Sequence, residues 1–289
     1  MKKSYLLSLL TFLPLGFAFN ATADENEINW QVFHAPPIHI KVGPDAGKGF
    51  VDLMLTELMS KMPEYQHHQP FTTQSRALHD IEVGKQVCHP SLFKTPEREK
   101  FAVFSKPTLF SPANRLIVKP ADIVALELPQ VIDLDEILQQ HQLTLGLVQG
   151  RSYGPYIDGI IKGYGDDNIV RISPEQSEVI FRLLENGRIQ STVAYPFEVN
   201  YYHRYNMQEA HQKVALYIKG EPEFVMGRVA CPNNEWGQKV VHRVNAVLSE
   251  LVRTDAYEKA MTTWWREEAD TAAFRDFYDT VFLSHYAIE

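Results

Sequence analysis

The sequence predicts an α/β fold divided into two lobes. Strands and helices alternate along the chain in two successive units, which is typical of sheets with helices packed on their faces. The length of 289 residues exceeds the size at which a single hydrophobic core usually stops growing. A composition of 45% hydrophobic and 22% charged residues excludes a disordered, collagen-like or coiled-coil chain.

The first α/β unit follows from the spacing of apolar residues in the first third of the chain. A strand is expected at 28–33 and an amphipathic helix over 50–62, where apolar residues recur at helical spacing until Pro63 stops them. A second helix is expected over 75–83, followed by a short buried strand at 86–88. This alternation implies a largely parallel sheet with helices on its faces.

A second unit repeats this pattern in the middle of the chain. Its expected elements are strands at 143–148 and 189–194 and helices over 157–162 and from Pro174 to 184. Two such units make two lobes.

The remaining segments flank these units. Strand-like stretches at 101–105 and 115–119 precede the second unit, and a strand at 228–231 follows it. Two helices are then expected, from about 235 to 252 and from 256 to about 268, with a tail that is also helical.

The N-terminus has the pattern of a secretory signal peptide over residues 1–23. Lys2-Lys3 precedes an apolar run at 5–19, and Ala21-Thr22-Ala23 supplies the small-x-small cleavage pattern. The alternative is a membrane anchor, but the run is broken by Pro14 and is shorter than the roughly 20 residues of a membrane span. Cleavage after Ala23 and export to an oxidising compartment are therefore expected.

Cys88 and Cys231 are the only cysteines in the chain. Because disulfides persist in an oxidising compartment, a single long-range bridge between them is the natural interpretation. The alternative is two buried free thiols, which pack as small hydrophobic groups.

Short motifs follow one another in a fixed order along the chain. They are Gly49-Phe50-Val51-Asp52-Leu53, Thr95-Pro96-Glu97-Arg98, Phe104-Ser105-Lys106-Pro107, Val148-Gln149-Gly150-Arg151-Ser152, Asn186-Gly187-Arg188-Ile189 and Gly227-Arg228-Val229-Ala230. Together they resemble the bacterial periplasmic solute-binding proteins of family 3, the amino-acid-receptor branch, from about Ile28 to Trp265. The cysteine pair and the R-S-Y-G turn at 151–154 resemble a poorly characterised proteobacterial subgroup of that family.

The resemblance implies a two-lobed periplasmic binding protein of type II with two hinge crossings, near Lys119 and near Gly220. Residues 24–118 and 224–289 would form the first lobe, and residues 119–223 the second. The returning strand at 228–231 would lie beside the strand that ends near Cys88, which favours the disulfide. Such a protein would be a monomer in the periplasm that holds a small solute between its lobes for an ABC permease or a sensory receptor.

The signature arginine of that family matches Arg98. The planar guanidinium of an arginine can donate two parallel hydrogen bonds to a ligand carboxylate in a water-poor cleft. Thr95, in the same turn, would add a hydroxyl or backbone donor. The alternative for Arg98 is a solvated surface charge in the charged run 97–100.

On the second lobe, Arg151 and Ser152 are candidate ligand-binding residues. The backbone N–H groups of 150–154 and the Ser152 hydroxyl could bind an anion where a helix begins, although Ser152 could equally be an ordinary N-cap. Arg76 and His34 are further candidates on the first lobe. For Arg76 the alternative is a charge on a helix surface.

Two departures from the family pattern concern the ligand. The Ser or Thr usually found five residues before the signature arginine is here Phe93, and the Asp that holds an α-ammonium is here Tyr195. Because a buried ammonium without a carboxylate partner is costly to desolvate, an ordinary amino acid is not the expected ligand. A ligand with one or more carboxylates fits better, with Tyr195, Tyr153 and Phe93 as apolar or stacking walls.

Other functions have little support in the sequence. The formal net charge of -8 provides no basic stripe for nucleic acid, and no histidine or cysteine spacing typical of a metal site occurs. No cofactor is expected, and neither is an enzyme. One alternative remains, a dehydratase-like enzyme on the same fold with Glu198 as general base; for Glu198 the competing interpretation is a helix-start carboxylate.

Overall fold

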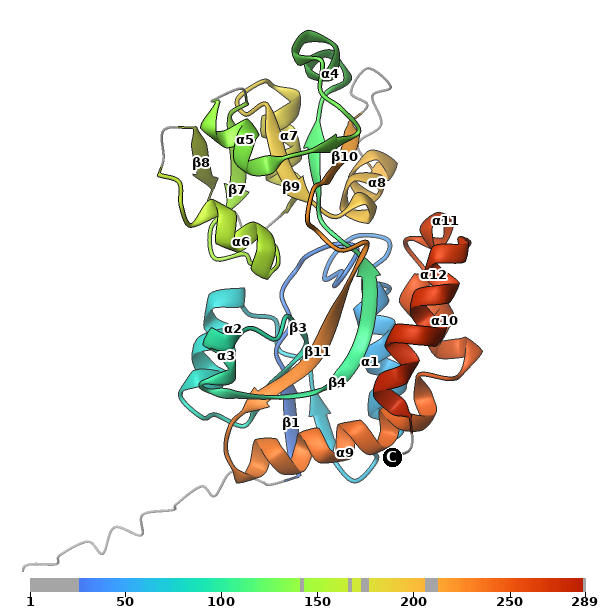
Figure 1. Ribbon diagram of the computed structural model, residues 1–289. Helices are drawn as coiled ribbons and strands as arrows, with labels where there is room; N and C mark the ends of the chain where they lie inside the picture. Colours follow the sequence, from blue (N-terminus) through green and yellow to red (C-terminus); the bar gives the residue numbers. More distant parts are fainter. Residues whose placement is uncertain (1–25, 141–142, 166–167, 173–176, 206–212, 288–289) are drawn as a thin grey trace, which may run out of the picture.

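Two separate β-sheets organise the chain in the computed structural model, which describes residues 26–140, 143–165, 168–172, 177–205 and 213–287. Each sheet lies in one of two lobes that are stacked end to end (Figure 1). The expected α/β fold with two lobes is confirmed. The signal-peptide segment 1–23 and Pro174 lie outside the described residues.

The first sheet has the strand order β2-β1-β3-β11-β4. Its strands are β1 (Glu27–Trp30), β2 (Gln66–His68), β3 (Val87–Leu92), β4 (Ala102–Pro112) and β11 (Phe224–Pro232). β1 is parallel to β2 and β3, whereas β11 is antiparallel to both β3 and β4. The sheet is thus mixed and not largely parallel, because the chain leaves this lobe along β4 and returns in the opposite direction along β11.

The second sheet has the strand order β6-β10-β5-β9-β7-β8. Its strands are β5 (Arg115–Val118), β6 (Val131–Ile132), β7 (Leu145–Val148), β8 (Ile169–Ile172), β9 (Ser191–Ala194) and β10 (Val214–Ile218). β7 is parallel to β8 and β9, whereas β5 is antiparallel to β9 and β10. This sheet is mixed for the same reason as the first, since β5 enters the lobe and β10 leads out of it.

The position of the first crossing corrects the expected boundary between the lobes. The segment through Val118 was assigned to the first lobe, with the crossing near Lys119. In the structure all four residues of β5 are buried and pair with β9 in the second sheet, so the chain crosses at Ala113-Asn114. The second crossing lies between β10 and β11, around Gly220 as expected. A strand-like pattern shows that a segment is extended but not which sheet it joins.

A disulfide joins Cys88 on β3 to Cys231 on β11. The two strands are neighbours in the first sheet, which places the two Cα atoms 4.4 Å apart. The predicted bridge is confirmed and the alternative of free thiols is wrong. Because the cysteines are 143 residues apart in sequence, the covalent loop encloses the second lobe.

Helices cover both sheets. Those of the first lobe are α1 (Phe50–Ser60), α2 (Gln74–Glu82), α3 (Pro96–Glu99), α9 (Glu235–Leu251), α10 (Asp255–Thr262), α11 (Arg266–Ala269) and α12 (Ala272–Asp276), followed by a π-helical turn (Phe277–Phe282) and a 3₁₀ turn (Leu283–Tyr286). Those of the second lobe are α4 (Pro120–Leu126), α5 (Leu134–Gln139), α6 (Pro155–Ile161), α7 (Ser177–Glu185) and α8 (Pro196–Tyr205). Within the described ranges, no helix is long and apolar enough to cross a membrane.

The C-terminal helices form one hydrophobic core with α1 and the first sheet. Phe110 on β4 lies at the centre of an aromatic group, with ring centroids 5.2 Å from Phe274 and 6.0 Å from Trp265. Trp265 is buried between α10 and α11, so the single helix expected over 256–268 is divided into two. Burying the indole inside the aromatic group outweighs continuing one helix, since a large aromatic side chain buries 150–250 Å².

Candidate functional site

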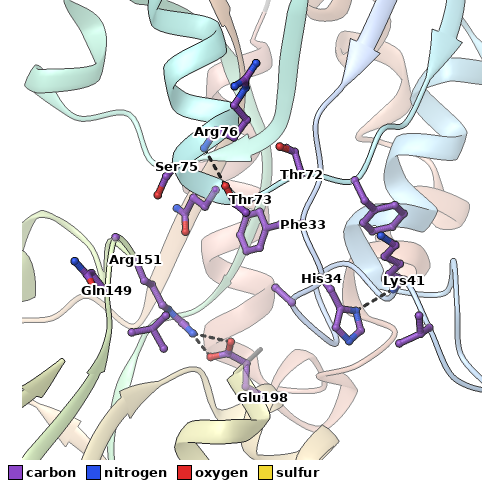
Figure 2. A pocket seen from close by; sticks show the side chains of 16 residues that line it. Phe33, His34, Lys41, Thr72, Thr73, Ser75, Arg76, Gln149, Arg151 and Glu198 are labelled. Carbon is purple, nitrogen blue, oxygen red and sulfur yellow. Dashed lines mark hydrogen bonds and ion pairs between the residues drawn. The ribbon is translucent and has the colours of Figure 1, made fainter. Parts of the chain in front are cut away.

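A cleft of about 1030 Å³ lies between the lobes (Figure 2). Residues before α1 and at the start of α2 line it from the first lobe, and the loop after β7 together with Glu198 lines it from the second. A smaller cavity of about 100 Å³ shares Phe33, Gln74, Arg151 and Glu198 with this cleft and extends to Arg98. The two spaces therefore belong to one interlobe site.

Arg98 lines the small cavity from the first lobe. It is only 9% exposed, whereas Glu97, Glu99 and Lys100 beside it are exposed, so the surface interpretation of Arg98 is wrong. Its Nη1 donates to the carbonyl of Phe93 at 3.0 Å, and no carboxylate of the described chain lies within ion-pair distance. Burial lowers the pKa of the guanidinium, which is the expected effect on a desolvated charge without a close partner.

Arg151 lines both spaces from the second lobe, but its charge is already neutralised. Its two terminal nitrogens donate to the two carboxylate oxygens of Glu198 at 2.9 and 2.8 Å (Figure 2). The guanidinium also lies over the rings of Tyr153 and Tyr195, at 5.0 and 5.4 Å from their centroids. Burial lowers the pKa of Arg151, but the Glu198 carboxylate outweighs burial and the net pKa is raised.

Glu198 is a helix-start carboxylate, as the competing interpretation held. It lies in the first turn of α8, is buried, and accepts a hydrogen bond from the N–H of Tyr195 at 2.9 Å. Together with the bidentate contact from Arg151, this leaves neither oxygen without a donor. The role of Glu198 as the counter-ion of Arg151 was missed, because their separation of 47 residues gives no local signal.

The turn at 150–154 already binds an anion that belongs to the chain. The Ser152 hydroxyl donates to Asp158 Oδ2 at 2.5 Å, and the Tyr153 N–H donates to Asp158 Oδ1 at 2.8 Å. Ser152 does not cap α6, whose N-cap is Gly154 with a φ of 106°, a conformation that favours glycine. Ser152 lines the small cavity, but its hydroxyl proton is used by Asp158.

The other predicted residues on the first lobe take different positions. Arg76 lines the large cleft, but its side chain is 57% exposed and forms an ion pair with Asp80 at 2.9 Å, as a helix-surface charge would. His34 also lines the cleft, and its Nδ1 accepts from the N–H of Lys41 at 3.0 Å. Thr95 lines neither space, because its hydroxyl caps α3 by accepting from the Arg98 N–H.

The predicted aromatic walls are present in part. Tyr195 and Phe93 line the small cavity, and Tyr195 stacks on Phe197 with 4.8 Å between ring centroids. Phe93 also packs against the main core of the first lobe. Tyr153 is buried in the second lobe, where its hydroxyl accepts from the Val148 N–H at 2.8 Å. Burial raises the pKa of Tyr153 to about 12, which keeps it neutral.

Two histidines of the small cavity were missed as site residues. His39 and His89 line it, and both rings are buried. His39 Nδ1 lies 2.7 Å from Asp52 Oδ1, and Asp52 Oδ2 accepts from the Gly49 N–H at 3.1 Å. The sequence contained one signal for these residues. The motif at 49–53 includes an aspartate for which no role was predicted, and such an acid needs a partner when it is buried. Only the docking of α1 brings that Asp to His39.

Gly49 is required by the close approach of two backbone segments at this point. A Cβ at this position would lie 2.3 Å from the carbonyl oxygen of Ile38, a distance that no side chain can occupy. The glycine thus lets the start of α1 pack directly against the segment that carries His39. In the motif at 49–53, Gly49 has this steric role and Asp52 holds the histidine.

Comparisons with known proteins rest on structure alone. No family model matches the sequence, and no curated protein matches it. A histidine kinase sensor domain with similarity to periplasmic binding proteins superimposes with a TM-score of 0.65 at 14% identity, over 83% of this chain and 96% of that one. The substrate-binding protein of an amino acid ABC transporter gives 0.62 at 18% identity, over 83% and 99%.

A third similar structure is an amino acid ABC transporter substrate-binding protein from Streptococcus pneumoniae bound to L-arginine. It gives a TM-score of 0.62 at 16% identity, over 86% of this chain and 98% of that one. Likeness at this level of identity defines the fold. The chain has the two-lobed α/β fold of periplasmic binding proteins, which carries ligand sites for both transport and sensing.

Proposed function

We propose that the chain is a periplasmic solute-binding protein that captures a small carboxylate-bearing solute between its lobes. The observation that carries this proposal is Arg98, a buried guanidinium without a carboxylate partner in the described chain, at the wall of an interlobe cavity. Such a charge is costly to desolvate unless an anion forms an ion pair with it. A ligand carboxylate is the anion that matches a guanidinium in two parallel hydrogen bonds.

The mechanism would be hinge closure driven by the ligand. The cavity is lined from both lobes, so a ligand bound to Arg98 reaches Arg151, Ser152 and Tyr195 only when the lobes are close. Those additional contacts shift the equilibrium toward the closed form. The two crossings at Ala113-Asn114 and around Gly220 would serve as hinges between a first lobe formed by both ends of the mature chain and a second lobe between them.

The predicted residues have different roles in this proposal. Arg98 binds the carboxylate, and Thr95 positions it through the cap of α3. Arg151, Ser152 and Tyr195 form the wall on the second lobe, while Arg76 and His34 line the outer cleft. An amino-acid ammonium would compete at Glu198 with donors that are already bound, because Arg151 donates to both oxygens and the Tyr195 N–H donates to one of them. The same contacts argue against Glu198 as a general base.

The partner would be an inner-membrane ABC permease or a sensor receptor, and both classes occur among the structural neighbours. Membership of solute-binding family 3, in the subgroup with a cysteine pair, is part of the proposal. It is supported by the order of the motifs and by the position of Arg98. Export with cleavage after Ala23 is supported by the sequence pattern and by the disulfide, which persists in an oxidising compartment.

Calorimetric titration of the purified protein tests the proposal. A panel of carboxylates, amino acids, polyamines and neutral sugars is compared on the parent protein and on Arg98→Ala. We expect carboxylates to bind to the parent protein and to lose affinity in the variant. Preference for a sugar or a polyamine, with binding indifferent to Arg98→Ala, would contradict the proposal. Mass spectrometry of the natively purified protein would identify a ligand that copurifies.

A further inference from the structure

The first-lobe wall of the small interlobe cavity holds three deeply buried polar side chains. Arg98 is 9% exposed, His89 is 2% exposed and His39 is 0% exposed. The two imidazole rings lie 6.4 Å apart between centroids, and Phe33 lies against both, at 6.5 Å from His39 and 5.9 Å from His89. The Nε2 atoms of both histidines are buried and have no hydrogen-bond partner in the described chain. Two unpartnered ring nitrogens beside a guanidinium without a counter-ion are typical of a site that a ligand completes.

The proton on His89 is located by its hydrogen bond. The N–H of Ser91 donates to His89 Nδ1 at 3.1 Å, so Nδ1 carries a lone pair and not a proton. Burial lowers the pKa of His89 well below its usual value, and the nearby His39 and Arg98 act in the same direction. The ring is therefore neutral with its proton on Nε2. His89 presents an N–H donor at the cavity.

His39 is held by a carboxylate through its other ring nitrogen. A carboxylate only accepts hydrogen bonds, so the 2.7 Å contact with Asp52 Oδ1 places a proton on His39 Nδ1. Asp52 is itself held by the N–H groups of Ile40 and Gly49, at 2.9 and 3.1 Å from its Oδ2. Nε2 is then the atom of His39 that lacks a partner in the described chain. The site thus offers a guanidinium, the N–H donor of His89 and the unpartnered Nε2 of His39.

The ligand group that complements this set is a carboxylate with a hydroxyl on the adjacent carbon. The carboxylate satisfies Arg98 and the Nε2–H of His89, and the hydroxyl satisfies Nε2 of His39, because a hydroxyl can both donate and accept a hydrogen bond. A hydroxyl suits this place better than an ammonium, which would add a positive charge beside Arg98 while Asp52 and Glu198 already hold other donors. The volume of about 100 Å³ is that of roughly three waters, enough for this group alone, and the large cleft has room for the rest of the ligand.

We propose that the ligand is a 2-hydroxycarboxylate, whose carboxylate binds Arg98 and His89 and whose hydroxyl forms a hydrogen bond with Nε2 of His39. This inference rests on the proposed solute-binding function and names the ligand class of that site. His39 and His89 determine specificity here, in place of the serine or threonine and the aspartate that Phe93 and Tyr195 replace.

Matched acids test the ligand class. Lactate, propionate and alanine share a carbon skeleton and differ only in carrying a hydroxyl, a hydrogen or an ammonium at carbon 2. Malate, succinate and aspartate form the same series with a second carboxylate for the large cleft. By calorimetric titration we expect the hydroxy acid of at least one series to bind about fivefold or more tightly than both its relatives, the effect of one buried hydrogen bond.

Asparagine variants separate the two histidines. In His39→Asn the amide can still donate to Asp52 but nothing replaces Nε2, so the preference for the hydroxyl should vanish while the unsubstituted acid binds as before. In His89→Asn the amide oxygen can still accept from Ser91, but the donor is lost. The affinity for all acids of the series should then fall by about five- to tenfold, and His89→Gln should restore part of the loss.

The matched control is His68→Asn, a substitution at an exposed position on β2, which should leave all these affinities unchanged. Thermal melting of each variant shows whether it is folded.

The outcomes separate this inference from the proposed function. If carboxylates bind and depend on Arg98, but the hydroxy acid is no better than its relatives or the amino acid is the tightest, the ligand class is wrong and the proposed function stands. The same holds if folded His39→Asn keeps the hydroxyl preference. If none of the six acids binds, the inference is overturned. If other carboxylates are also refused and a neutral solute binds instead, both proposals fail.

Discussion

Arg98 and Arg151 line the same interlobe cavity from opposite lobes, yet their electrostatic states differ. Arg98 donates to one backbone carbonyl and has no ion-pair partner in the described chain. Arg151 forms a bidentate ion pair with Glu198. A buried pair is largely satisfied, whereas a buried single charge still favours an anion. In the proposed site, Arg98 would therefore supply the charge for a ligand, whereas Arg151 would form part of the opposite wall.

The difference arises from the elements that surround each arginine. The first turn of α8 brings Glu198 to Arg151 from a distant part of the sequence. Around Arg98 no described acid forms an ion pair with it. Glu97 is exposed, and Glu99 forms an ion pair with Lys94 at 2.8 Å. The charges of Asp158 and Glu97 only partly offset the lowering of the Arg98 pKa by burial. Acidic neighbours in sequence therefore do not neutralise Arg98, while a distant acid neutralises Arg151.

Removing the partner of Arg151 should have the largest effect on stability. Glu198→Ala leaves a mostly buried guanidinium without its carboxylate, and we expect a loss of about 3 kcal/mol in the free energy of unfolding, measured by urea denaturation. The double variant Arg151→Met/Glu198→Leu removes both charges and should recover most of the loss. A loss below about 0.5 kcal/mol for Glu198→Ala, within the range of ordinary surface substitutions, would mean that the pair is not structural.

Removing Arg98 should affect binding and not stability. Arg98→Ala deletes a charge-assisted contact worth about 2 to 5 kcal/mol, which weakens carboxylate binding by tens- to thousands-fold in a calorimetric titration. Arg98→Lys should recover only part of the affinity, since an ammonium lacks the bidentate fork. The free energy of unfolding of the unliganded protein should stay the same or rise, because a desolvated charge without a partner is removed. If Arg98→Ala unfolded more easily than the parent protein but bound carboxylates with normal affinity, Arg98 would have a structural role and not a binding role.

Arg76 is the control arginine for Arg98, and its replacement should have only a small effect on stability and on binding. Its i,i+4 pair with the buried Asp80, in which only the Arg76 side chain is exposed, should contribute about 0.3 to 0.5 kcal/mol. Asp80 keeps Lys85 and Gln31 as partners when Arg76 is replaced. Arg76→Ala should therefore leave the urea midpoint and the carboxylate affinity nearly unchanged. A loss of affinity comparable to that of Arg98→Ala would move the carboxylate site outward into the large cleft.

Glu221 tests with a carboxylate the principle that a buried charge without a close partner is unfavourable. Its expected effect is the smallest of those considered. It lies at the second crossing, half-buried, with Oε2 lacking a hydrogen-bond partner among the residues described. Burial raises its pKa from 4.5 to about 7, which Arg115 only partly offsets. Because the folded state holds the proton more tightly, the stability that this group contributes is present at pH 4.5 and is lost as the pH rises through 7.

The comparison of Glu221→Gln with the parent protein measures this contribution. The melting temperature of the parent should fall relative to that of the variant between pH 4.5 and about pH 7, the interval set by the two pKa values. A difference in melting temperature between parent and variant that stays constant across this interval would mean that Glu221 does not titrate there.

Local patterns were sufficient for much of the fold. The apolar spacing of α1 predicted a helix that the structure has at Phe50–Ser60, because one buried face of a helix repeats at a period that the sequence displays. The order of the motifs predicted two lobes, and two cysteines in a chain expected to be exported predicted one bridge. Arg98 was predicted as a ligand-binding residue from the resemblance of its motif, and the structure places it at the wall of the small cavity.

Tertiary structure alone decided the remaining features. β5 could join either sheet, and its pairing with β9 placed it in the second. Glu198 and Arg151 meet because α8 and the loop after β7 converge, and His39 faces the cavity because α1 docks with Asp52 beneath it. Ionic and hydrogen-bonded pairs act over a few ångströms between residues far apart in sequence, so a residue type gives its charge but not its partner. Whether an arginine is free to bind a ligand is therefore a property of the packed molecule.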